Sequence, residues 1–319
     1  MKEIKISEIK GIKVGHAQDV EGGTGCTVIL CEEGACAGVD VRGGAPASRE
    51  TELLRSENMV DRIHAVMFSG GSAFGLDACS GAMQFLEEKG AGLDVKIAKI
   101  PIVCGTCVFD INVGDPKCRP DKAMGYDACV AAEKGEPGEG NVGAGTGASV
   151  GKFFGRPRMM KGGVGIYAVQ AGDVQCAAVV VVNAVGDVFD CETGEQIAGL
   201  LSEDKSKLVS TVSVMYDEIG KNRNLFSGNT TIGCIVTNAK LTKPQCNKLA
   251  SITHDGFARA IRPVHTTADG DTIFVMSTGE VQVSPDGLGA LASEVMAKAI
   301  GRAVRKAEPA YGLKAAREF

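Results

Sequence analysis

Apolar and polar residues along the chain form two kinds of pattern, one typical of strands and one typical of helices. Short alternating or continuous apolar runs predict strands, and apolar positions three and four residues apart predict amphipathic helices. The predicted strands are Cys26–Leu30, Ala35–Val41, Ala65–Ser69, Val164–Val169, Val174–Val182, Leu208–Val214, Thr231–Thr237 and Thr272–Ser277. The predicted helices are Ser48–Arg62, Ala73–Lys89, Lys122–Lys134, Lys243–Arg262 and Pro285–Lys306.

The order of these elements favours an α+β fold in one layered body. Strands cluster along the chain and helices come singly or in pairs between them, unlike the regular alternation of a doubly wound parallel sheet. Ser48 is a candidate helix cap because a Thr and a Glu follow it three and four residues on. Pro244 stands in the first turn of a predicted helix, where proline is tolerated.

The composition is that of a folded globular protein with an unusual share of glycine. Apolar residues make up 44% and charged residues 23% of the 319 positions, which excludes a disordered or fibrous chain. The 43 glycines are about twice the usual share of ~7% and follow no collagen period, so we expect tight turns and close backbone approaches. A net charge of −5 gives no electrostatic reason to bind nucleic acid or an anionic membrane.

The apolar runs and the cysteines favour a cytoplasmic protein that holds no metal or cofactor. Charged residues interrupt Met1–Glu8, where a secretory signal would be apolar, and the longest strong apolar run, Cys176–Val182, is far short of the ~20 residues of a membrane span. We interpret the twelve cysteines as small buried hydrophobic residues rather than a disulfide framework. Cys104 and Cys107 lack the second pair or the nearby histidines that would complete a zinc site.

A glycine-rich segment, 136–151, invites a nucleotide-binding interpretation that its spacing does not support. A P-loop requires Gly-x-x-x-x-Gly-Lys-Ser/Thr, but here Thr146 replaces the first glycine and Phe153 follows Lys152. The glycines are also wrongly spaced for a dinucleotide fingerprint. The alternative is a turn in which the backbone approaches another segment closely.

Ser72 lies in a segment that resembles the nucleophile elbow of hydrolases, although Phe74 stands where the elbow requires glycine. A helix that begins near Ala73 after a Gly-Gly turn is the favoured interpretation of this segment taken alone. A Ser-His-Asp triad is therefore poorly supported, since each histidine is more often a packed or surface residue than a catalytic base. The four histidines are His16, His64, His254 and His265.

The sequence Asn229-Thr230-Thr231 indicates a different nucleophile. A threonine hydroxyl is a weak nucleophile unless a base lies beside it, and a free α-amine on the same residue supplies that base. The chain would have to be cut between Asn229 and Thr230 to release this amine. The polar segment Asp217–Gly228, which runs directly into the predicted strand, is an accessible place for such a cut. Taken alone, the tripeptide is common, and the start of a strand is its default interpretation.

Five further motifs accompany Asn-Thr-Thr, and together they resemble one family. In chain order the set is Gly70-Gly71-Ser72-Ala73-Phe74-Gly75-Leu76-Asp77-Ala78, Gly143-Ala144-Gly145-Thr146-Gly147-Ala148, Lys161-Gly162-Gly163-Val164-Gly165, Val182-Asn183-Ala184-Val185-Gly186-Asp187, Asn229-Thr230-Thr231-Ile232-Gly233 and Asp269-Gly270-Asp271. This set resembles the DmpA-like self-cleaving N-terminal nucleophile hydrolases. That family includes L-aminopeptidase/D-esterases, β-peptidyl aminopeptidases and nylon-oligomer hydrolases. The likeness extends from about Gly11 to Glu280.

The resemblance implies a single domain over residues 1–319, folded as a four-layer αββα sandwich of the DmpA/ornithine acetyltransferase type. It implies self-cleavage into Met1–Asn229 and Thr230–Phe319, with Thr230 as the nucleophile. It implies that Asn183 stabilises the oxyanion. Such a donor is typically worth about 100- to 1,000-fold in rate.

The resemblance also assigns three charged residues to the site. Lys152 matches an active-site lysine of the nylon-oligomer hydrolases, and Asp269 and Asp271 match their two acidic residues. The lysine would help keep the α-amine unprotonated. The two carboxylates would accept hydrogen bonds from the α-amine and the hydroxyl of Thr230. Some aminopeptidase members have serine at the position of Asp269, which favours the nylon-hydrolase-like branch. Others have a tyrosine near the oxyanion, in the segment that here reads Val108-Phe109-Asp110, so we assign no tyrosine.

These observations predict a cytoplasmic, cofactor-free amidohydrolase that cleaves small peptides or amide oligomers through an acyl-enzyme on Thr230. By the family's pattern it would be a homotetramer of cleaved pairs, with a small peptide or amide as its substrate. An acyltransferase of the ornithine acetyltransferase type is the alternative within enzymes. A binding or assembly protein that keeps the fold without turnover is the alternative outside them.

Overall fold

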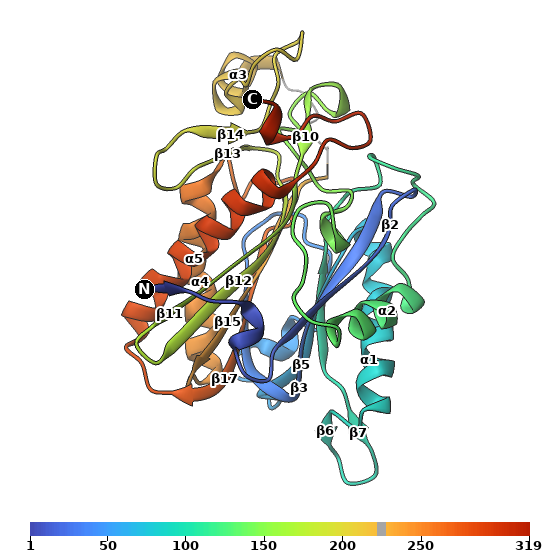
Figure 1. The fold of residues 1–319 in the computed structure, drawn as a ribbon, viewed down its shortest axis with the longest axis vertical. Helices are drawn as coiled ribbons and strands as arrows, with labels where there is room; N and C mark the ends of the chain where they lie inside the picture. Colours follow the sequence, from blue (N-terminus) through green and yellow to red (C-terminus); the bar gives the residue numbers. More distant parts are fainter. Residues whose placement is uncertain (222–227) are drawn as a thin grey trace.

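Ten strands pair into a continuous sheet whose two halves form the two inner layers of the molecule. The structure is a computed structural model, and it describes residues 1–221 and 228–319 (Figure 1). The long strand β3 (Thr24–Val41) joins the halves, because Thr24–Leu30 pairs with β2 and Cys36–Val41 pairs with β17.

One half of the sheet contains the strands that reach the candidate site. Its order is β1 (Lys2–Glu3), β11 (Gly163–Ala171), β12 (Val174–Asn183), β15 (Thr230–Ala239), β17 (Thr272–Val281) and the second part of β3. The other half consists of β2 (Lys13–Asp19), the first part of β3, β5 (Arg62–Ser69), β8 (Val103–Cys107) and β4 (Ser48–Arg49). Smaller pairings involve β6 (Leu93–Asp94), β7 (Lys99–Ile100), β9 (Ser149–Val150), β10 (Met160–Lys161), β13 (Asp187–Phe189), β14 (Gln196–Ala198) and β16 (Ile261–Arg262).

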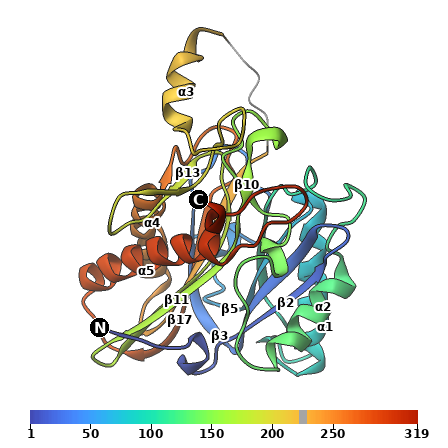
Figure 2. The same ribbon diagram turned by 45° about the horizontal axis from the view of Figure 1, so that its top comes forward.

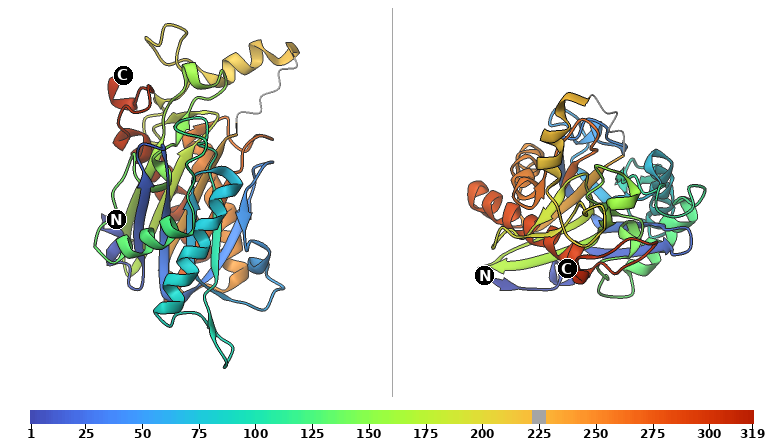
Figure 3. Two further views of the ribbon diagram at one scale, coloured as in Figure 1. Left: turned by 90° about the vertical axis from the view of Figure 1, so that its right-hand side faces the viewer. Right: turned by 90° about the horizontal axis from the view of Figure 1, so that it is seen from above.

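Helices cover the outer face of each half. Figures 1 and 3 show α4 (Lys243–Ala260) and α5 (Pro285–Lys306) on one side of the sheets, and α1 (Ala78–Glu88) and α2 (Lys122–Ala132) on the other. Figure 2 shows α3 (Thr211–Asp217) standing away from this body. No helix in the described ranges combines the length and the apolar character that crossing a membrane requires.

The strand side chains alternate between two cores, as a strand with period two requires. In β12, Val179 and Val181 face the other half of the sheet, where they share a core with Ile29 of β3 and Phe68 of β5. Val180 lies on the opposite face, in the core with α4 and α5. A third core lies under α1 and α2. The layers therefore run helix, sheet, sheet, helix, which confirms the predicted α+β sandwich.

Two predicted elements are wrong. The segment predicted as the helix Ser48–Arg62 begins with the edge strand β4, continues in a short 3-10 turn over Glu52–Leu54 and ends in β5. Pairing of β4 with β8 takes the residues of the expected first turn, and Glu50 has a φ of 61°, which an α-helix does not allow.

The predicted strand Leu208–Val214 is helical from Thr211 onward. Ser210 caps α3, because its side chain accepts a hydrogen bond from the Ser213 amide at 3.2 Å. The polar segment Asp217–Gly228, predicted as accessible to cleavage, falls partly on residues 222–227, which lie outside the described residues.

Candidate active site

Three strands bring the predicted site residues to one edge of the sheet. Thr230 is the first residue of β15, and it pairs with Asn183, the last residue of β12. β17 runs parallel to β15 and begins at Thr272, so Asp269 and Asp271 arrive at the same edge. The sheet register therefore places Thr230 between Asn183 and the Asp-Gly-Asp segment.

The Thr230 hydroxyl lies against the peptide bond that precedes it. Its Oγ1 donates a hydrogen bond to the carbonyl oxygen of Asn229. The Gly270 amide donates to the same oxygen at 2.9 Å. A Cβ atom on Gly270 would lie 2.8 Å from Thr230 Oγ1, so a glycine allows this close approach. The Thr230 hydroxyl and one amide donor thus converge on the Asn229 carbonyl, with Thr230 only 4% exposed.

Lys152 and Asn183 form a buried pair beside this peptide bond. Lys152 Nζ donates to Asn183 Oδ1 at 2.5 Å and to the Gly228 carbonyl oxygen at 3.4 Å. The Ser149 amide also donates to Asn183 Oδ1, at 3.0 Å, and Asn183 Nδ2 donates to the Phe109 carbonyl at 3.1 Å. These contacts fix which end of the Asn183 amide carries the donor.

Burial lowers the pKa of Lys152 from 10.5 to about 7. The charges of Asp269 and Asp110 oppose this shift, and the charge of Lys161 adds to it. A lysine with this pKa exists in both protonation states near neutral pH, so its amine can accept a proton as well as donate one.

The two carboxylates have different partners while the 229–230 peptide bond is intact. Asp269 Oδ2 accepts hydrogen bonds from the amide and the hydroxyl of Thr266, at 2.8 and 2.6 Å. Asp271 Oδ1 accepts from the Thr231 amide at 2.7 Å, and Asp271 Oδ2 accepts from His265. Burial, together with the neighbouring charge of Asp271, raises the pKa of Asp269 to about 6. The α-amine that both residues are expected to orient does not exist before cleavage.

The structure adds two charged residues to the neighbourhood of Lys152. Asp110 is buried and accepts hydrogen bonds from the Gly71 amide at 2.6 Å and the Thr24 hydroxyl at 2.7 Å, and burial raises its pKa. Lys161 is a second fully buried lysine, and burial lowers its pKa to about 7. Lys161 opens one of the motifs that carry the family likeness, and Asp110 lies in the segment where other members of the family have a tyrosine. In the sequence, the feature that could identify these two residues is a charged side chain within a glycine-rich or apolar segment.

Lys161 holds the glycine loop in place. Its Nζ donates to the carbonyl oxygens of Gly145, Thr146 and Ala148 at 3.3, 2.8 and 2.7 Å. Ser149 follows this loop directly and donates to Asn183. These contacts connect the glycine-rich segment to Lys161 and to the Asn183 side chain. They agree with its interpretation as a turn that approaches another segment closely.

The remaining candidates lie in structural positions. Ser72 begins a 3-10 turn ahead of α1, and Cys104 and Cys107 are buried in β8. His16 contacts Thr27 at 2.9 Å and belongs to β2. Of the four histidines, His265 alone has a hydrogen bond to a predicted site residue among the bonds of the described chain.

Nearly the whole chain matches a known family. A profile of peptidase family S58 covers residues 5–317. The chain is 37% identical to an uncharacterised aminopeptidase of Mycobacterium bovis, over 98% of this chain and 97% of that one. It is 33% identical to the 6-aminohexanoate-oligomer endohydrolase of Paenarthrobacter ureafaciens, over 94% of this chain and 85% of that one. The solved L-aminopeptidase D-Ala-esterase/amidase of Ochrobactrum anthropi, described as a variant of the Ntn-hydrolase fold, superimposes with a TM-score of 0.71 at 18% identity, over 95% of this chain and 86% of that one.

Proposed function

The chain belongs to peptidase family S58 and is a hydrolase of amide or peptide bonds, and we propose that Thr230 is its nucleophile, released by self-cleavage between Asn229 and Thr230. One observation carries the proposal. The Thr230 hydroxyl and the Gly270 amide both bond to the carbonyl oxygen of Asn229, so the attacking group and a donor for the oxyanion are already beside the bond to be cut.

Self-cleavage begins with attack of Thr230 Oγ1 on the Asn229 carbonyl carbon. Lys152, whose amine is partly neutral near pH 7, takes the hydroxyl proton, and the Gly270 amide stabilises the oxyanion. The C–N bond then breaks, the Thr230 nitrogen takes up a proton, and an ester joins Asn229 to Thr230. Water hydrolyses this ester to give Met1–Asn229 and Thr230–Phe319.

Cleavage also provides a route to the buried nucleophile. Asn229 is 1% exposed and its backbone bridges to that of Asp269, so its new carboxylate forms in a buried place next to an acidic residue. Two like charges in a buried site repel each other strongly. We infer that this repulsion moves the new chain end away and opens space next to Thr230 for a substrate.

Turnover reuses the same groups on an external amide. The free α-amine of Thr230, with an unperturbed pKa of about 7.7–8.0, takes the hydroxyl proton. Asn183 and the Gly270 amide stabilise the oxyanion, and Asp269 and Asp271 orient the new terminus. The relatives that carry aminopeptidase and 6-aminohexanoate-oligomer endohydrolase names support small peptides or amide oligomers as substrates.

The experiment compares wild type with Thr230→Ala and Thr230→Ser. We expect wild type to hydrolyse amino acid p-nitroanilides or 6-aminohexanoate oligomers, Thr230→Ser to retain cleavage and turnover, and Thr230→Ala to lose both. Hydrolysis by purified Thr230→Ala protein would contradict the proposal. Transfer of acetyl from acetylornithine to glutamate, without amide hydrolysis, would instead identify an acyltransferase.

Assembly and location are further parts of this proposal. We propose a cytoplasmic homotetramer of cleaved pairs, on the pattern of the family that the sequence resembles. Native light scattering should then return about four times the chain mass of 33.0 kDa. A mass near that of one chain would contradict the tetramer.

A further inference from the structure

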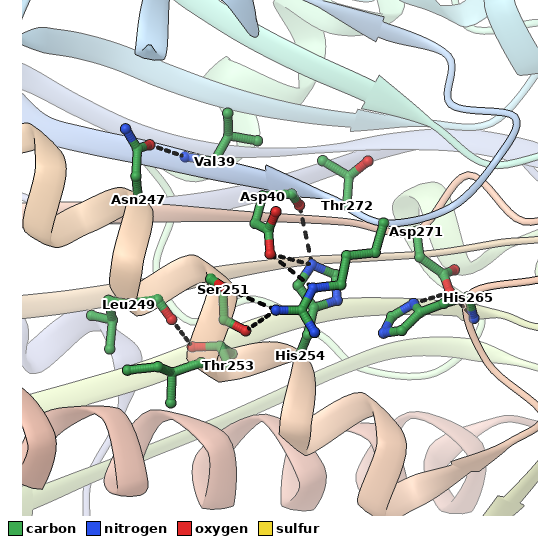
Figure 4. A network of polar contacts seen from close by, with 12 residues as sticks. Val39, Asp40, Asn247, Leu249, Ser251, Thr253, His254, His265, Asp271 and Thr272 are labelled. Carbon is green, nitrogen blue, oxygen red and sulfur yellow. Dashed lines mark hydrogen bonds and ion pairs between the residues drawn. The ribbon is translucent and has the colours of Figure 1, made fainter. Parts of the chain in front are cut away.

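His265 makes two hydrogen bonds to one oxygen of Asp271. Its backbone amide donates to Asp271 Oδ2 at 2.9 Å, and its ring Nδ1 lies 2.8 Å from the same oxygen (Figure 4). A carboxylate oxygen only accepts, so Nδ1 carries the proton in this contact. His265 has a φ of 58°, in the left-handed region that residues other than glycine adopt uncommonly. The loop after β16 is thus shaped to bring both donors to Asp271.

The other oxygen of Asp271 reaches the nucleophile's own peptide unit. Asp271 Oδ1 accepts the Thr231 amide at 2.7 Å, and this amide belongs to the peptide bond between Thr230 and Thr231. After cleavage Thr230 is a chain end, and chain ends fray unless they are tied down. The bond from Asp271 to Thr231 holds that end one peptide unit from the nucleophile.

We propose that His265 is a positioning residue for the reaction at Thr230. It holds the Asp271 carboxylate so that one oxygen faces the Thr230–Thr231 peptide unit. The inference deepens the proposed function and rests on it. It adds a residue that the motif Asp269-Gly270-Asp271 does not contain.

Two residues of α4 hold the His265 ring in place. The ring of His254 lies at 4.7 Å from it, edge to face, and the ring of Phe257 stacks at 6.1 Å. His254 is anchored in turn, because its Nε2 lies 3.1 Å from the Asp40 carbonyl oxygen of β3 (Figure 4). The aromatic contacts fix the ring plane, and the ring plane aims Nδ1 at Asp271.

The test uses variants that keep either the side-chain hydrogen-bond donor of His265 or its aromatic ring, but not both. His265→Asn places an amide donor at the position of Nδ1 and tolerates the positive φ, but it removes the ring. His265→Phe keeps the ring between His254 and Phe257 and removes the donor. Both are made in the full chain, and kcat and KM for an amino acid p-nitroanilide are measured on the cleaved fraction of each.

We expect His265→Phe to lower kcat by about 10- to 100-fold, less than the about 100- to 10,000-fold that a general acid or base contributes directly, because His265 acts through Asp271. KM should stay within about threefold, and His265→Asn should restore most of kcat. His265→Gln moves the amide one carbon farther out, so it should show the same loss as His265→Phe. This second variant keeps the test valid if His265→Phe does not fold.

A double-mutant cycle shows whether His265 acts through Asp271. In an Asp271→Asn background, adding His265→Gln should reduce kcat by less than about twofold, because the group it positions is already changed. Wild-type kcat in cleaved His265→Gln protein, or losses that multiply in the double variant, would overturn the inference. Failure of the proposed function has a different signature, namely a wild-type chain that stays uncut or Thr230→Ala protein that hydrolyses the substrate.

Discussion

Lys152 and Lys161 are both fully buried in a region that contains the candidate nucleophile. Burial lowers the pKa of each from 10.5 to about 7, although Asp110 lies close enough to oppose both shifts. In the unfolded chain a lysine keeps its proton up to about pH 10.4. Between pH 7 and that value the unfolded state therefore binds more protons than the folded state, so the free energy of unfolding rises with pH.

This difference in bound protons predicts that the free energy of unfolding of the uncut protein changes measurably with pH. Each lysine contributes up to about 1.4 kcal/mol per pH unit to the rise above pH 7. Above about pH 8.5 the buried thiols oppose the rise, since cysteines of the unfolded chain then ionise. In a Thr230→Ala background, we expect Lys152→Met to reduce the slope between pH 7 and 8.5 by about 1 kcal/mol per pH unit in urea unfolding. Lys161→Met should flatten it similarly. An unchanged slope in both variants would show that neither lysine has a lowered pKa.

Among individual residues, the sequence singles out candidates that a motif marks and leaves out those whose contacts form only between distant segments. Thr230, Asn183 and Lys152 lie together, as their motifs predict. Asp110 stayed unassigned, because it meets Gly71, 39 positions away, only in the folded chain. In the sequence, His265 stands out only as a possible base for a serine.

The central strands were predicted closely because they are buried on both faces. Val174–Val182 and Thr231–Thr237 correspond to β12 and β15, whose continuous apolar runs stand out in the sequence. The missed elements are short and lie outside this core. Pairing with β8 makes the β4 segment a strand, and the Ser210 side-chain cap determines where α3 begins. Such local interactions outweigh a weak apolar pattern.

The conformation of Gly228, just before β15, leads to a prediction about self-cleavage. Gly228 has a φ of 55°, and a Cβ there would lie 2.3 Å from the Phe109 ring. We therefore expect Gly228→Ala to slow self-cleavage, because the Asn229–Thr230 bond and the Phe109 contact with Asn183 must both shift. Gel electrophoresis over time after expression measures the cut fraction.

Gly172 provides the matched control. It has a φ of 60° in the turn between β11 and β12, and a Cβ there would meet no atom within 4 Å. Gly172→Ala should cost about 1 kcal/mol of stability and leave self-cleavage unchanged. Cleavage of Gly228→Ala at the wild-type rate would mean that the geometry before Thr230 does not control the reaction.

For the whole molecule, the proposed cut divides the sheet without dividing the fold. Thr230–Phe319 contains β15, β17, α4 and α5, and β15 and β17 lie between β12 and β3 of the other fragment. Each fragment alone would expose two core faces. We therefore expect the two fragments to remain associated after cleavage.

Two cysteines on opposite sides of the proposed cut report this association. Cys36 of β3 belongs to the larger fragment and Cys246 of α4 to the smaller one, and their Sγ atoms are 4.0 Å apart. Oxidation by diamide removes one hydrogen from each thiol and forms a disulfide. We expect a band near 33.0 kDa on a non-reducing gel, which dithiothreitol converts into two fragments.

Controls locate the crosslink. Cys36→Ser should prevent it, whereas Cys118→Ser, a half-buried cysteine in another part of the molecule, should leave it unchanged. Two separate fragment bands from oxidised wild type would contradict the arrangement of β3 and α4 across the cut.

The central claim, that Thr230 cuts its own chain, is tested most directly by intact mass and N-terminal sequencing of purified protein. Wild type should give two fragments, the smaller beginning Thr-Thr-Ile-Gly, and Thr230→Ala should give one chain of 319 residues. A wild-type protein that remains a single chain, or a Thr230→Ala protein cut at the same bond, would contradict the account.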